Sequence, residues 1–301
     1  MNTKKSHGEK TLQIQEVGPR DGFQIIEQFI PTEIKLETID LLIKSGIKKI
    51  QVTSFVNPKA VPQMSDASEI ASICVQKYPD ASIFALVPNL RGADNAVNAG
   101  LNEIAVVLSL SESHNKANVG KTVAESIDEL KRIKDVHSSI KIDVDISTAF
   151  SCPFEGEMEI SKLVELVGNL YEIGIRDMTL CDTIGSAYPS QIVTAFDTVL
   201  SEYADVVFNV HIHDTRNMGM LNTYLAILHG AVGVQSSLGG LGGCPFAPGA
   251  SGNTATEDLV YMLGAEGFDT GVDFGLLLDA ARFLKEHVDG NYSGHHITIK
   301  S

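Results

Sequence analysis

Two histidines separated by one residue, His211 and His213, stand in the stretch "NVHIHDTRNMG" (209–219). Side chains alternate across a β-strand, so both imidazoles would lie on one face if this stretch is extended. A neutral imidazole is a common ligand of divalent cations, but two histidines near a strand end are equally compatible with ordinary polar packing. The spacing alone leaves both interpretations open.

A candidate oxygen ligand for such a cation is Asp21, in the stretch "EVGPRDG" (16–22). One aspartate, two histidines and one neutral oxygen donor suit a divalent cation such as Mg²⁺, Mn²⁺ or Zn²⁺. A cation held by a single carboxylate keeps a net positive charge, so it would polarise a substrate oxygen and lower the pKa of a bound hydroxyl. If Asp21 lies near the histidines, the chain carries the residues for metal-assisted acid–base chemistry.

Two more charged residues accompany Asp21 in this stretch. Arg20 is either the ion-pairing residue of a surface turn or a fixed cation that stabilises a developing enolate oxygen. Glu16 lies within the preceding strand, where a carboxylate is unexpected unless it has a partner. We expect Glu16 to contact Arg20 or a polar group of a ligand.

The densest signal is the stretch "SLGGLGGCPFAPGASGNTATEDL" (237–259), which holds six glycines and two prolines. It predicts a mobile lid, with an ordinary long connection as the alternative. Cys244 would lie on this lid, either as an acid–base group or as an inert buried thiol. Asn253 is either the neutral metal ligand or the N-cap of the following helix, in which Glu257 and Asp258 either support the metal ligands or are plain helix acids.

Short apolar segments alternate with longer segments of helical periodicity, which predicts right-handed βαβ units and a parallel sheet. Eight such units in about 250 residues fit a (β/α)₈ barrel. A doubly wound open sheet is the alternative, but no G-x-G-x-x-G follows the first strand. The predicted strands are residues 12–17, 49–55, 82–87, 103–109, 141–147, 177–182, 206–212 and 233–237.

In a barrel of this kind the active site lies at the carboxyl ends of the strands, so polar and glycine-rich clusters should follow the strands. The clusters "GPRDG", "SES" and "GGLGGCP" follow predicted strands, and "TSF", "CDT" and "HIHDT" end them. The first and seventh strands are separated only by the eighth, which brings Asp21 towards the histidines. Asp182 in "CDTIG" ends the sixth strand at the same rim, although an aspartate there is also a common helix N-cap.

Composition narrows the class of protein further. The 301 residues carry a formal net charge of −15, with no basic run beyond "KKSHGEK", which argues against binding to nucleic acid or anionic membranes. Four dispersed cysteines without a C-x-x-C pair fit a reducing compartment. No apolar run reaches the roughly 18 residues of a spanning helix and no apolar leader is present, so we expect a soluble cytoplasmic protein. We expect residues 1–10 to form a disordered tail, residues 11–290 a single barrel domain with an extra helix after Thr270, and residues 291–301 a polar tail.

Together the motifs resemble those of a known family. The stretches "EVGPRDGFQ", "TSFVNPK", "VPNLRG", "SESHNKAN", "CDTIG", "HIHDT" and "GGLGGCPFAPGASGNTATEDLVYML" are similar to stretches of hydroxymethylglutaryl-CoA lyases, members of the metal-dependent DRE-TIM group of (β/α)₈ enzymes. The resemblance covers residues 12–290. Its most specific part is the glycine-rich loop, whereas R-D-G and H-x-H are shared with related Claisen-type synthases.

The resemblance implies a retro-Claisen cleavage of 3-hydroxy-3-methylglutaryl-CoA to acetyl-CoA and acetoacetate, a step of leucine degradation, with Mg²⁺ or Mn²⁺ as cofactor. Arg20 would stabilise the enolate, Cys244 would be the acid–base group of the lid, and Asp182 would help to move the proton of the C3 hydroxyl. The partner would be an acyl-CoA, and barrels of this kind often form homodimers. The implied metal ligands are Asp21, His211, His213 and Asn253, and the candidate substrate-binding residues are Gln24, Glu16 and Gln51.

Several positions depart from the family pattern. Gln51 in "IQVTSF" replaces a glutamate that looks like a partner of the catalytic arginine, which would leave Arg20 less firmly held. Ala60 in "NPKAVPQ" replaces a tryptophan, and the fifth strand carries Asp143 and Asp145 where relatives commonly have an aromatic residue. Because residues around the chemistry-bearing set have changed, the acyl substrate could differ from hydroxymethylglutaryl-CoA.

Other classes of function stay open at this point. A lyase for a different 3-hydroxyacyl-CoA acid fits the same residues. A Claisen-type synthase shares R-D-G and H-x-H, but such enzymes generally carry an accessory C-terminal domain and lack the "GGCP" lid. An amidohydrolase-like enzyme would carry His-x-His on its first strand instead of its seventh, and a catalytically silent barrel would not be expected to keep Arg20, Cys244 and Asp182.

Overall fold

The structure is a computed structural model that describes residues 10–243 and 252–299. Two of the sequence predictions therefore lie outside the described residues. These are the disorder of the N-terminal tail over residues 1–9 and the position of Cys244 on a lid.

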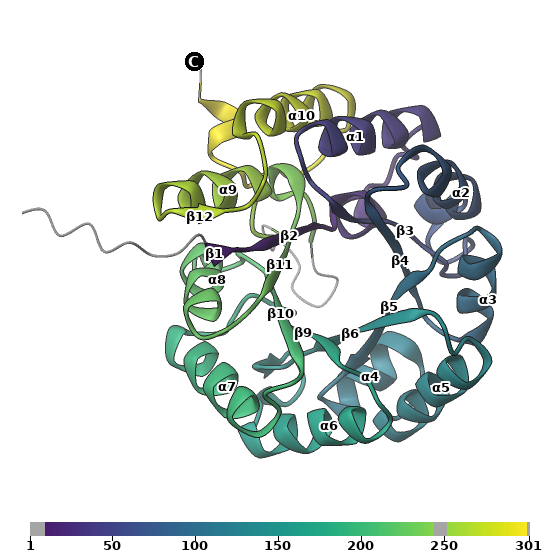
Figure 1. Cartoon of the computed structure of the whole chain (residues 1–301), viewed down its shortest axis with the longest axis vertical. Coiled ribbons are helices and arrows are strands. Elements are labelled where there is room, and N and C mark those ends of the chain that lie inside the picture. Colours follow the sequence, from purple (N-terminus) through teal and green to yellow (C-terminus); the bar gives the residue numbers. More distant parts are fainter. Residues whose placement is uncertain (1–9, 244–251, 300–301) are drawn as a thin grey trace, which may run out of the picture.

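Eight parallel strands of the described chain close into a barrel, seen end-on in Figure 1. Around the barrel the order is β10, β11, β2, β3, β4, β5, β6 and β9, so the eighth strand, β11, pairs with the first, β2. The (β/α)₈ prediction is confirmed, and the closing pair excludes a doubly wound open sheet. The strands are β2 (Gln13–Glu16), β3 (Lys49–Ser54), β4 (Ser82–Val87), β5 (Glu103–Ser109), β6 (Lys141–Ser147), β9 (Asp177–Asp182), β10 (Val207–Ile212) and β11 (Gly233–Ser236).

Helices follow the strands along the chain and form the outer ring in Figure 1. Their starts follow local chemistry: before α5, Thr122 accepts a bond from the N–H of Glu125, whose carboxylate accepts the N–H of Thr122. None of the helices in residues 10–243 and 252–299 has the length and apolar character needed to cross a membrane. The helices are α1 (Thr32–Lys44), α2 (Ala67–Lys77), α3 (Leu90–Asn98), α4 (Glu112–Val119), α5 (Val123–Val136), α6 (Ile160–Glu172), α7 (Pro189–Glu202), α8 (Gly219–Leu228), α9 (Thr256–Ala265) and α10 (Phe274–His287).

The barrel wall separates an apolar shell from a polar interior, and β6 shows how. Ile142, Val144 and Ile146 belong to the apolar core that packs the strands against the helices. Asp143 and Asp145 alternate with them and point to the other side of the wall, because successive side chains leave a strand on opposite faces. Thr179 Oγ1 on the neighbouring strand β9 donates to Asp143 at 3.2 Å, and Gln235 Nε2 on β11 donates across the interior to Asp145 at 3.0 Å. The side chains that face the barrel interior below its mouth are therefore polar and joined by hydrogen bonds.

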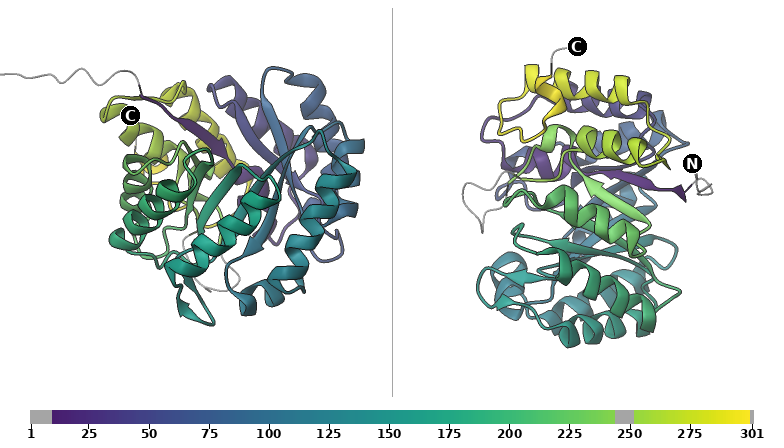
Figure 2. Two further views of the ribbon diagram at one scale, coloured as in Figure 1. Left: turned by 60° about the horizontal axis from the view of Figure 1, so that its bottom comes forward. Right: turned by 90° about the vertical axis from the view of Figure 1, so that its left-hand side faces the viewer.

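Short strand pairs and the C-terminal segment complete the fold. β1 (Lys10–Thr11) pairs with β12 (Phe268–Asp269), and β7 (Ser151–Cys152) forms a hairpin with β8 (Gly156–Glu157). The extra helix predicted after Thr270 is confirmed as α10, which lies beside α1 in Figures 1 and 2. Residues 291–299 then pack on the barrel: the N–H of Gly294 donates to the carbonyl oxygen of Gly239 at 3.0 Å, and Ile297 is buried.

Candidate active site

A cavity of 610 Å³ opens at the carboxyl ends of the barrel strands, where the fold places active sites. It gathers residues that lie far apart in the sequence. Arg20 and Asp21 come from the turn after β2, His211 and His213 from the end of β10, and Gln235 from β11. The strand order explains the meeting, since β11 lies between β10 and β2.

Asp21, His211 and His213 form a buried cluster whose ligand atoms all lie within 4.8 Å of one another. The centroids of the two histidine rings are 5.0 Å apart, so the imidazoles share one face of β10 as the H-x-H spacing predicts. No other group of three such side chains meets this geometry within residues 10–243 and 252–299. The donor set of one carboxylate and two imidazoles can hold a divalent cation.

Asn253 adds an oxygen to this cluster. Its Nδ2 donates to Asp21 Oδ2 at 2.8 Å and to the carbonyl oxygen of Leu241 at 3.2 Å. Its Oδ1 is buried and has no hydrogen-bond partner among the described residues, an uncommon state that leaves a neutral donor available. The interpretation of Asn253 as a helix N-cap is wrong, because α9 begins at Thr256 with Ala255 as its N-cap.

The electrostatics of the cluster suit metal ligands. Burial opposes the ionised form of Asp21, but the charge of Arg20, the two histidines and the bond from Asn253 together lower the pKa of this carboxyl to about 2. Burial lowers the pKa of His211 to about 4 and also lowers the pKa of His213. Near neutral pH the cluster therefore holds one carboxylate and two neutral imidazoles, the forms that bind cations.

Arg20 is held from two sides at the edge of this cluster. Its Nε donates to Oε1 of Gln51 on β3, and its Nη1 donates to Oδ1 of Asp21. Gln24 donates to the same Asp21 oxygen at 3.1 Å. Gln51 is fully buried behind the arginine and is absent from the described cavity lining, whereas Gln24 lines it. Gln51 thus positions Arg20 as a neutral acceptor.

Two glycines allow the chain on either side of residues 244–251 to converge beside Asn253. A side chain at Gly242 would come within 2.5 Å of Asn253 Nδ2. Gly252 has a φ of +89°, and a side chain there would come within 2.6 Å of the Gly242 backbone. The backbone of Asn253 also pairs with that of His213. Because neither glycine has a side chain, Asn253 can lie next to His213, the other candidate ligand.

Comparison with known proteins gives the family. Residues 11–284 match the HMGL-like protein family. This chain belongs to the HMGL-like family. It is 40% identical over 279 residues to the hydroxymethylglutaryl-CoA lyase YngG of Bacillus subtilis, covering 92% of this chain and 93% of that protein. The resemblance seen in the motifs is confirmed.

Solved structures of HMGL-like proteins have the same fold. An HMG-CoA lyase of Bacillus subtilis aligns with a TM-score of 0.91 at 38% identity, over 96% of this chain and 97% of that chain. An HMG-CoA lyase of Acinetobacter baumannii in complex with coenzyme A and 3-methylmalate aligns with a TM-score of 0.88 at 37% identity, over 97% of this chain and 98% of that chain.

In this HMGL-like protein, Glu16 lies on the outer side of the barrel wall. Its carboxylate accepts bonds from the N–H groups of Gly18 at 2.7 Å and Leu238 at 2.9 Å, and from Thr256 Oγ1 at 2.7 Å. The predicted contact with Arg20 is wrong, since the described bonds of Arg20 go to Gln51 and Asp21, and Glu16 is absent from the described cavity lining where a ligand would lie. Glu16 is fully buried and joins β2 to the turn after β11 and to α9.

Glu257 and Asp258 also face away from the cluster. Glu257 accepts a bond from the N–H of Gly239 at 2.9 Å. Asp258 accepts bonds from the N–H groups of His295 at 2.7 Å and His296 at 2.9 Å, which ties the C-terminal segment to α9. These acids therefore hydrogen-bond backbone N–H groups, and they can influence the candidate ligands only by holding the backbone in place.

Asp182 ends β9 as predicted, but its side chain is turned out of the cavity. Its Oδ1 accepts the N–H of Ser186 at 3.1 Å and its Oδ2 accepts the N–H of Ala187 at 3.0 Å. Cys181 and Thr183, its neighbours on either side, line the cavity. Burial raises the pKa of Asp182 to about 6. In this structure the carboxylate holds the turn that follows the strand.

Gln235 and Asp145 are polar cavity residues that were not among the sequence candidates for the site. Gln235 lies opposite His211 in the register of β10 and β11, with its Oε1 at 3.0 Å from His211 Nδ1. Asp145, noted only as a departure from the family, lines the cavity and hydrogen-bonds Gln235. The available signal was strand alternation, which places Gln235 on the same side of the wall as the histidines. His114 lines the cavity as well and hydrogen-bonds Ser109.

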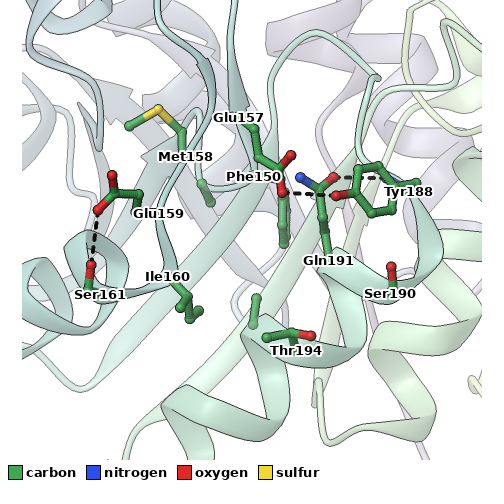
Figure 3. A pocket seen from close by; sticks show the side chains of 12 residues that line it. Phe150, Glu157, Met158, Glu159, Ile160, Ser161, Tyr188, Ser190, Gln191 and Thr194 are labelled. Carbon is green, nitrogen blue, oxygen red and sulfur yellow. Dashed lines mark hydrogen bonds between the residues drawn. The ribbon is translucent and has the colours of Figure 1, made fainter.

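A second cavity, of 660 Å³, lies outside the barrel between the β7–β8 hairpin and the start of α7, as Figure 3 shows. The hydroxyl of Tyr188 donates to Glu157 there at 2.9 Å. Its described lining combines two glutamates and several hydroxyl groups with apolar side chains, and includes no histidine, cysteine, lysine or arginine. Size does not separate the two cavities, but only the one at the barrel mouth carries a cation-binding set.

Proposed function

We propose that this chain cleaves 3-hydroxy-3-methylglutaryl-CoA to acetyl-CoA and acetoacetate, using Mg²⁺ or Mn²⁺ held by Asp21, His211, His213 and Asn253. The observation that carries the proposal is the meeting of the Asp21–His211–His213 cluster with Arg20 in one cavity. The family and the relatives of the chain are those of carbon–carbon lyases, so it is an enzyme of that class.

The residues present fit such a cation. Two neutral imidazoles, an ionised Asp21 and the free Oδ1 of Asn253 supply the lone pairs. Once bound, the cation would polarise the substrate oxygens and lower the pKa of the C3 hydroxyl. Mg²⁺ and Mn²⁺ prefer oxygen donors, and the carboxylate and the amide provide them.

Arg20 supplies the fixed positive charge for bond cleavage. When the C2–C3 bond breaks, its electron pair stays on the acetyl-CoA fragment as an enolate, while C3 becomes the carbonyl carbon of acetoacetate. Gln51 and Asp21 already hold the guanidinium in place, so little reorganisation is needed when charge develops on the enolate oxygen.

Two proton transfers complete the reaction. In our proposal Asp182 takes the proton of the C3 hydroxyl, for which a pKa of about 6 is well suited. Its oxygens accept hydrogen bonds from backbone N–H groups of the following turn in this structure. This role therefore requires the turn to rearrange when substrate binds. Cys244, outside the described residues, is the proposed acid that protonates the enolate.

The test uses protein stripped with a chelator and resupplied with Mg²⁺ or Mn²⁺. We expect hydroxymethylglutaryl-CoA to yield acetyl-CoA and acetoacetate in equal amounts only when the cation is present. Cation binding without product formation would overturn the proposed substrate.

A second candidate is a lyase for another 3-hydroxyacyl-CoA acid. The observation in its favour is the cavity lining, in which Ala60 is small and Asp145 contributes a polar carboxyl group. A panel of 3-hydroxyacyl-CoA acids with larger or more polar C3 substituents decides between the two. A higher kcat/KM for one of them than for hydroxymethylglutaryl-CoA would favour this candidate.

The proposed compartment is the cytoplasm, where reducing conditions suit the free thiols of Cys74, Cys152 and Cys181. A homodimer, and the lack of nucleic-acid and membrane partners, stay predictions from the resemblance and from composition. Measurement of the mass in solution tests the first of them.

A further inference from the structure

Gln235 connects a candidate metal ligand to a carboxylate on the far side of the barrel interior. Its Oε1 lies 3.0 Å from His211 Nδ1, and its Nε2 donates to Asp145 Oδ1 at 3.0 Å. The three side chains come from β10, β11 and β6, and each is at least 94% buried. A continuous hydrogen-bonded path therefore runs from Asp145 to the imidazole of His211.

The direction of this path follows from the chemistry of its ends. An amide has a donating face and an accepting face, and rotation by about 180° exchanges them. An ionised carboxylate only accepts hydrogen bonds, so above the raised pKa of Asp145 its charge requires the Nε2 of Gln235 to face it, as in the 3.0 Å bond to Asp145 Oδ1. The other neighbour agrees, because Thr179 Oγ1 donates its proton to Asp143 and accepts from Gln235 Nε2 at 3.4 Å. The Oε1 of Gln235 must then face His211.

This orientation determines the tautomer of His211. Facing an amide oxygen, Nδ1 carries the proton and donates it to Gln235, so Nε2 keeps its lone pair. If the amide were reversed, its NH₂ group would face Nδ1 and favour the tautomer protonated at Nε2. That tautomer has no lone pair at Nε2 to bind a cation.

We propose that Asp145 is a positioning residue that, through Gln235, fixes His211 in the tautomer whose Nε2 binds the divalent cation. The proposal rests on the proposed function only in using the same cation site. It gives a role to a carboxylate that departs from the family pattern.

The experiment measures the affinity of the metal-free protein for Mn²⁺, from the free-ion signal in electron paramagnetic resonance. Asp145→Leu removes the acceptor that orients Gln235, and we expect the affinity to fall roughly 10- to 100-fold, the scale for loss of an outer partner of a metal ligand. Asp143→Asn is the matched control on the same strand. Asp143 hydrogen-bonds Thr179 and not Gln235, and an asparagine keeps an acceptor oxygen for the Thr179 hydroxyl, so the variant should keep the Mn²⁺ affinity.

A second substitution separates orientation from packing. Gln235→Glu places a carboxylate beside His211 that accepts the Nδ1 proton in either orientation and no longer depends on Asp145. In the Asp145→Leu background, Gln235→Glu should therefore restore most of the lost Mn²⁺ affinity. A packing defect at position 145 would not be repaired by this change, so failure of the rescue in a folded double variant overturns the proposal.

The wild-type protein offers a test that needs no variant. In ¹⁵N spectra of the metal-free protein, the histidine assigned to position 211 should show the tautomer protonated at Nδ1. Protonation at Nε2 would overturn the proposal. If Mn²⁺ binding responds to the variants as expected and hydroxymethylglutaryl-CoA is not cleaved, the proposed function fails and the tautomer proposal stands. If the substrate is cleaved and Asp145→Leu binds Mn²⁺ normally, only the tautomer proposal fails.

Discussion

Asp21 and Glu16, two buried carboxylates of one short stretch, stand on opposite sides of the barrel wall, and their pKa values are shifted in opposite directions. Inside the cavity, the pKa of Asp21 is lowered to about 2. On the outer side, burial raises the pKa values of Glu16 and Glu257 to about 7. The partners differ: Asp21 faces Arg20 and the two histidines, whereas the outer pair faces N–H groups, a hydroxyl and each other's charge.

This contrast shows that burial alone does not identify a functional carboxylate. Burial opposes ionisation on both sides of the wall, and it also raises the pKa values of the inward-facing Asp143 and Asp145. At Asp21 the charge of Arg20, the two histidines and the bond from Asn253 together reverse the outcome. Glu16 and Asp21 belong to one short stretch of sequence. Glu16 nevertheless links β2 to the turn after β11, whereas Asp21 belongs to the cation-binding cluster. A carboxylate that stays ionised when buried is the better candidate for a ligand.

Asp21→Ala should have the largest effect on turnover. Loss of the only carboxylate in the cluster should lower the Mn²⁺ affinity by more than roughly 100-fold, the upper scale for loss of an outer partner, and reduce turnover to that of metal-free protein. Glu16→Gln is the matched control on the other side of the wall and should bind Mn²⁺ normally. Metal analysis that shows full occupancy in Asp21→Ala would remove this residue from the ligand set.

Arg20→Gln should keep the cation and lose rate. The guanidinium is proposed to act when the enolate forms, so kcat should fall by roughly 100- to 1,000-fold, as for loss of an oxyanion donor. The affinity for Mn²⁺ should change little, because Arg20 supplies no lone pair. Steady-state kinetics at saturating cation checks this, and near-normal kcat would exclude Arg20 from the mechanism.

The fold and the inward-facing part of the site follow directly from sequence periodicity. β6 was predicted and is found over residues 141–147, because its apolar residues alternate with polar ones between two turn signals. The same alternation gives His211 and His213 a common face. Asp21 could be joined to them because strand order in a closed barrel is fixed by chain order.

The wrong predictions used the position of a residue along the chain and did not consider which face of the strand its side chain leaves. Asp182 was taken as a cavity residue because it ends β9, yet Cys181 and Thr183 occupy the inward positions. Glu16 was expected to contact Arg20 or a polar group of a ligand, because a carboxylate within a strand needs a partner. Asp182 accepts the N–H groups of the turn that follows it. Glu16 accepts the N–H of Leu238 and the hydroxyl of Thr256, which are far along the chain and which no local pattern reveals.

Gln51→Glu should have a smaller effect on turnover, and in the opposite direction. The Nε2 of Gln51 is buried without a hydrogen-bond partner among the described residues, so the amide donor contributes nothing that a carboxylate would lose. A charged acceptor would hold Arg20 about twice as strongly. We expect kcat to rise a few-fold, on the order of 1 kcal/mol, and Gln51→Ala to lower it. A fall in kcat for Gln51→Glu would instead show that the enzyme needs an unneutralised guanidinium.

Glu257→Gln should change turnover least and stability most clearly. The pKa of Glu257 is about 7 in the folded protein and near its ordinary value of 4.5 when the chain unfolds. The folded state therefore holds the proton more tightly, so this stability is fully present below pH 4.5 and is lost as the pH rises through 7. The loss is roughly 3 kcal/mol for this one group.

The amide in Glu257→Gln stays neutral at every pH, so the variant removes the titration of this outer carboxylate and leaves the cavity side chains unchanged. Urea unfolding of the metal-free protein at pH 5 and pH 8 should show a clear loss of stability for the wild type and a smaller loss for the variant. Turnover should match that of the wild type, since Glu257 has no hydrogen bond to a candidate ligand among the described residues. If turnover of a folded Glu257→Gln falls as far as that of Asp21→Ala, the outer carboxylates take part in the reaction and the division at the barrel wall is wrong.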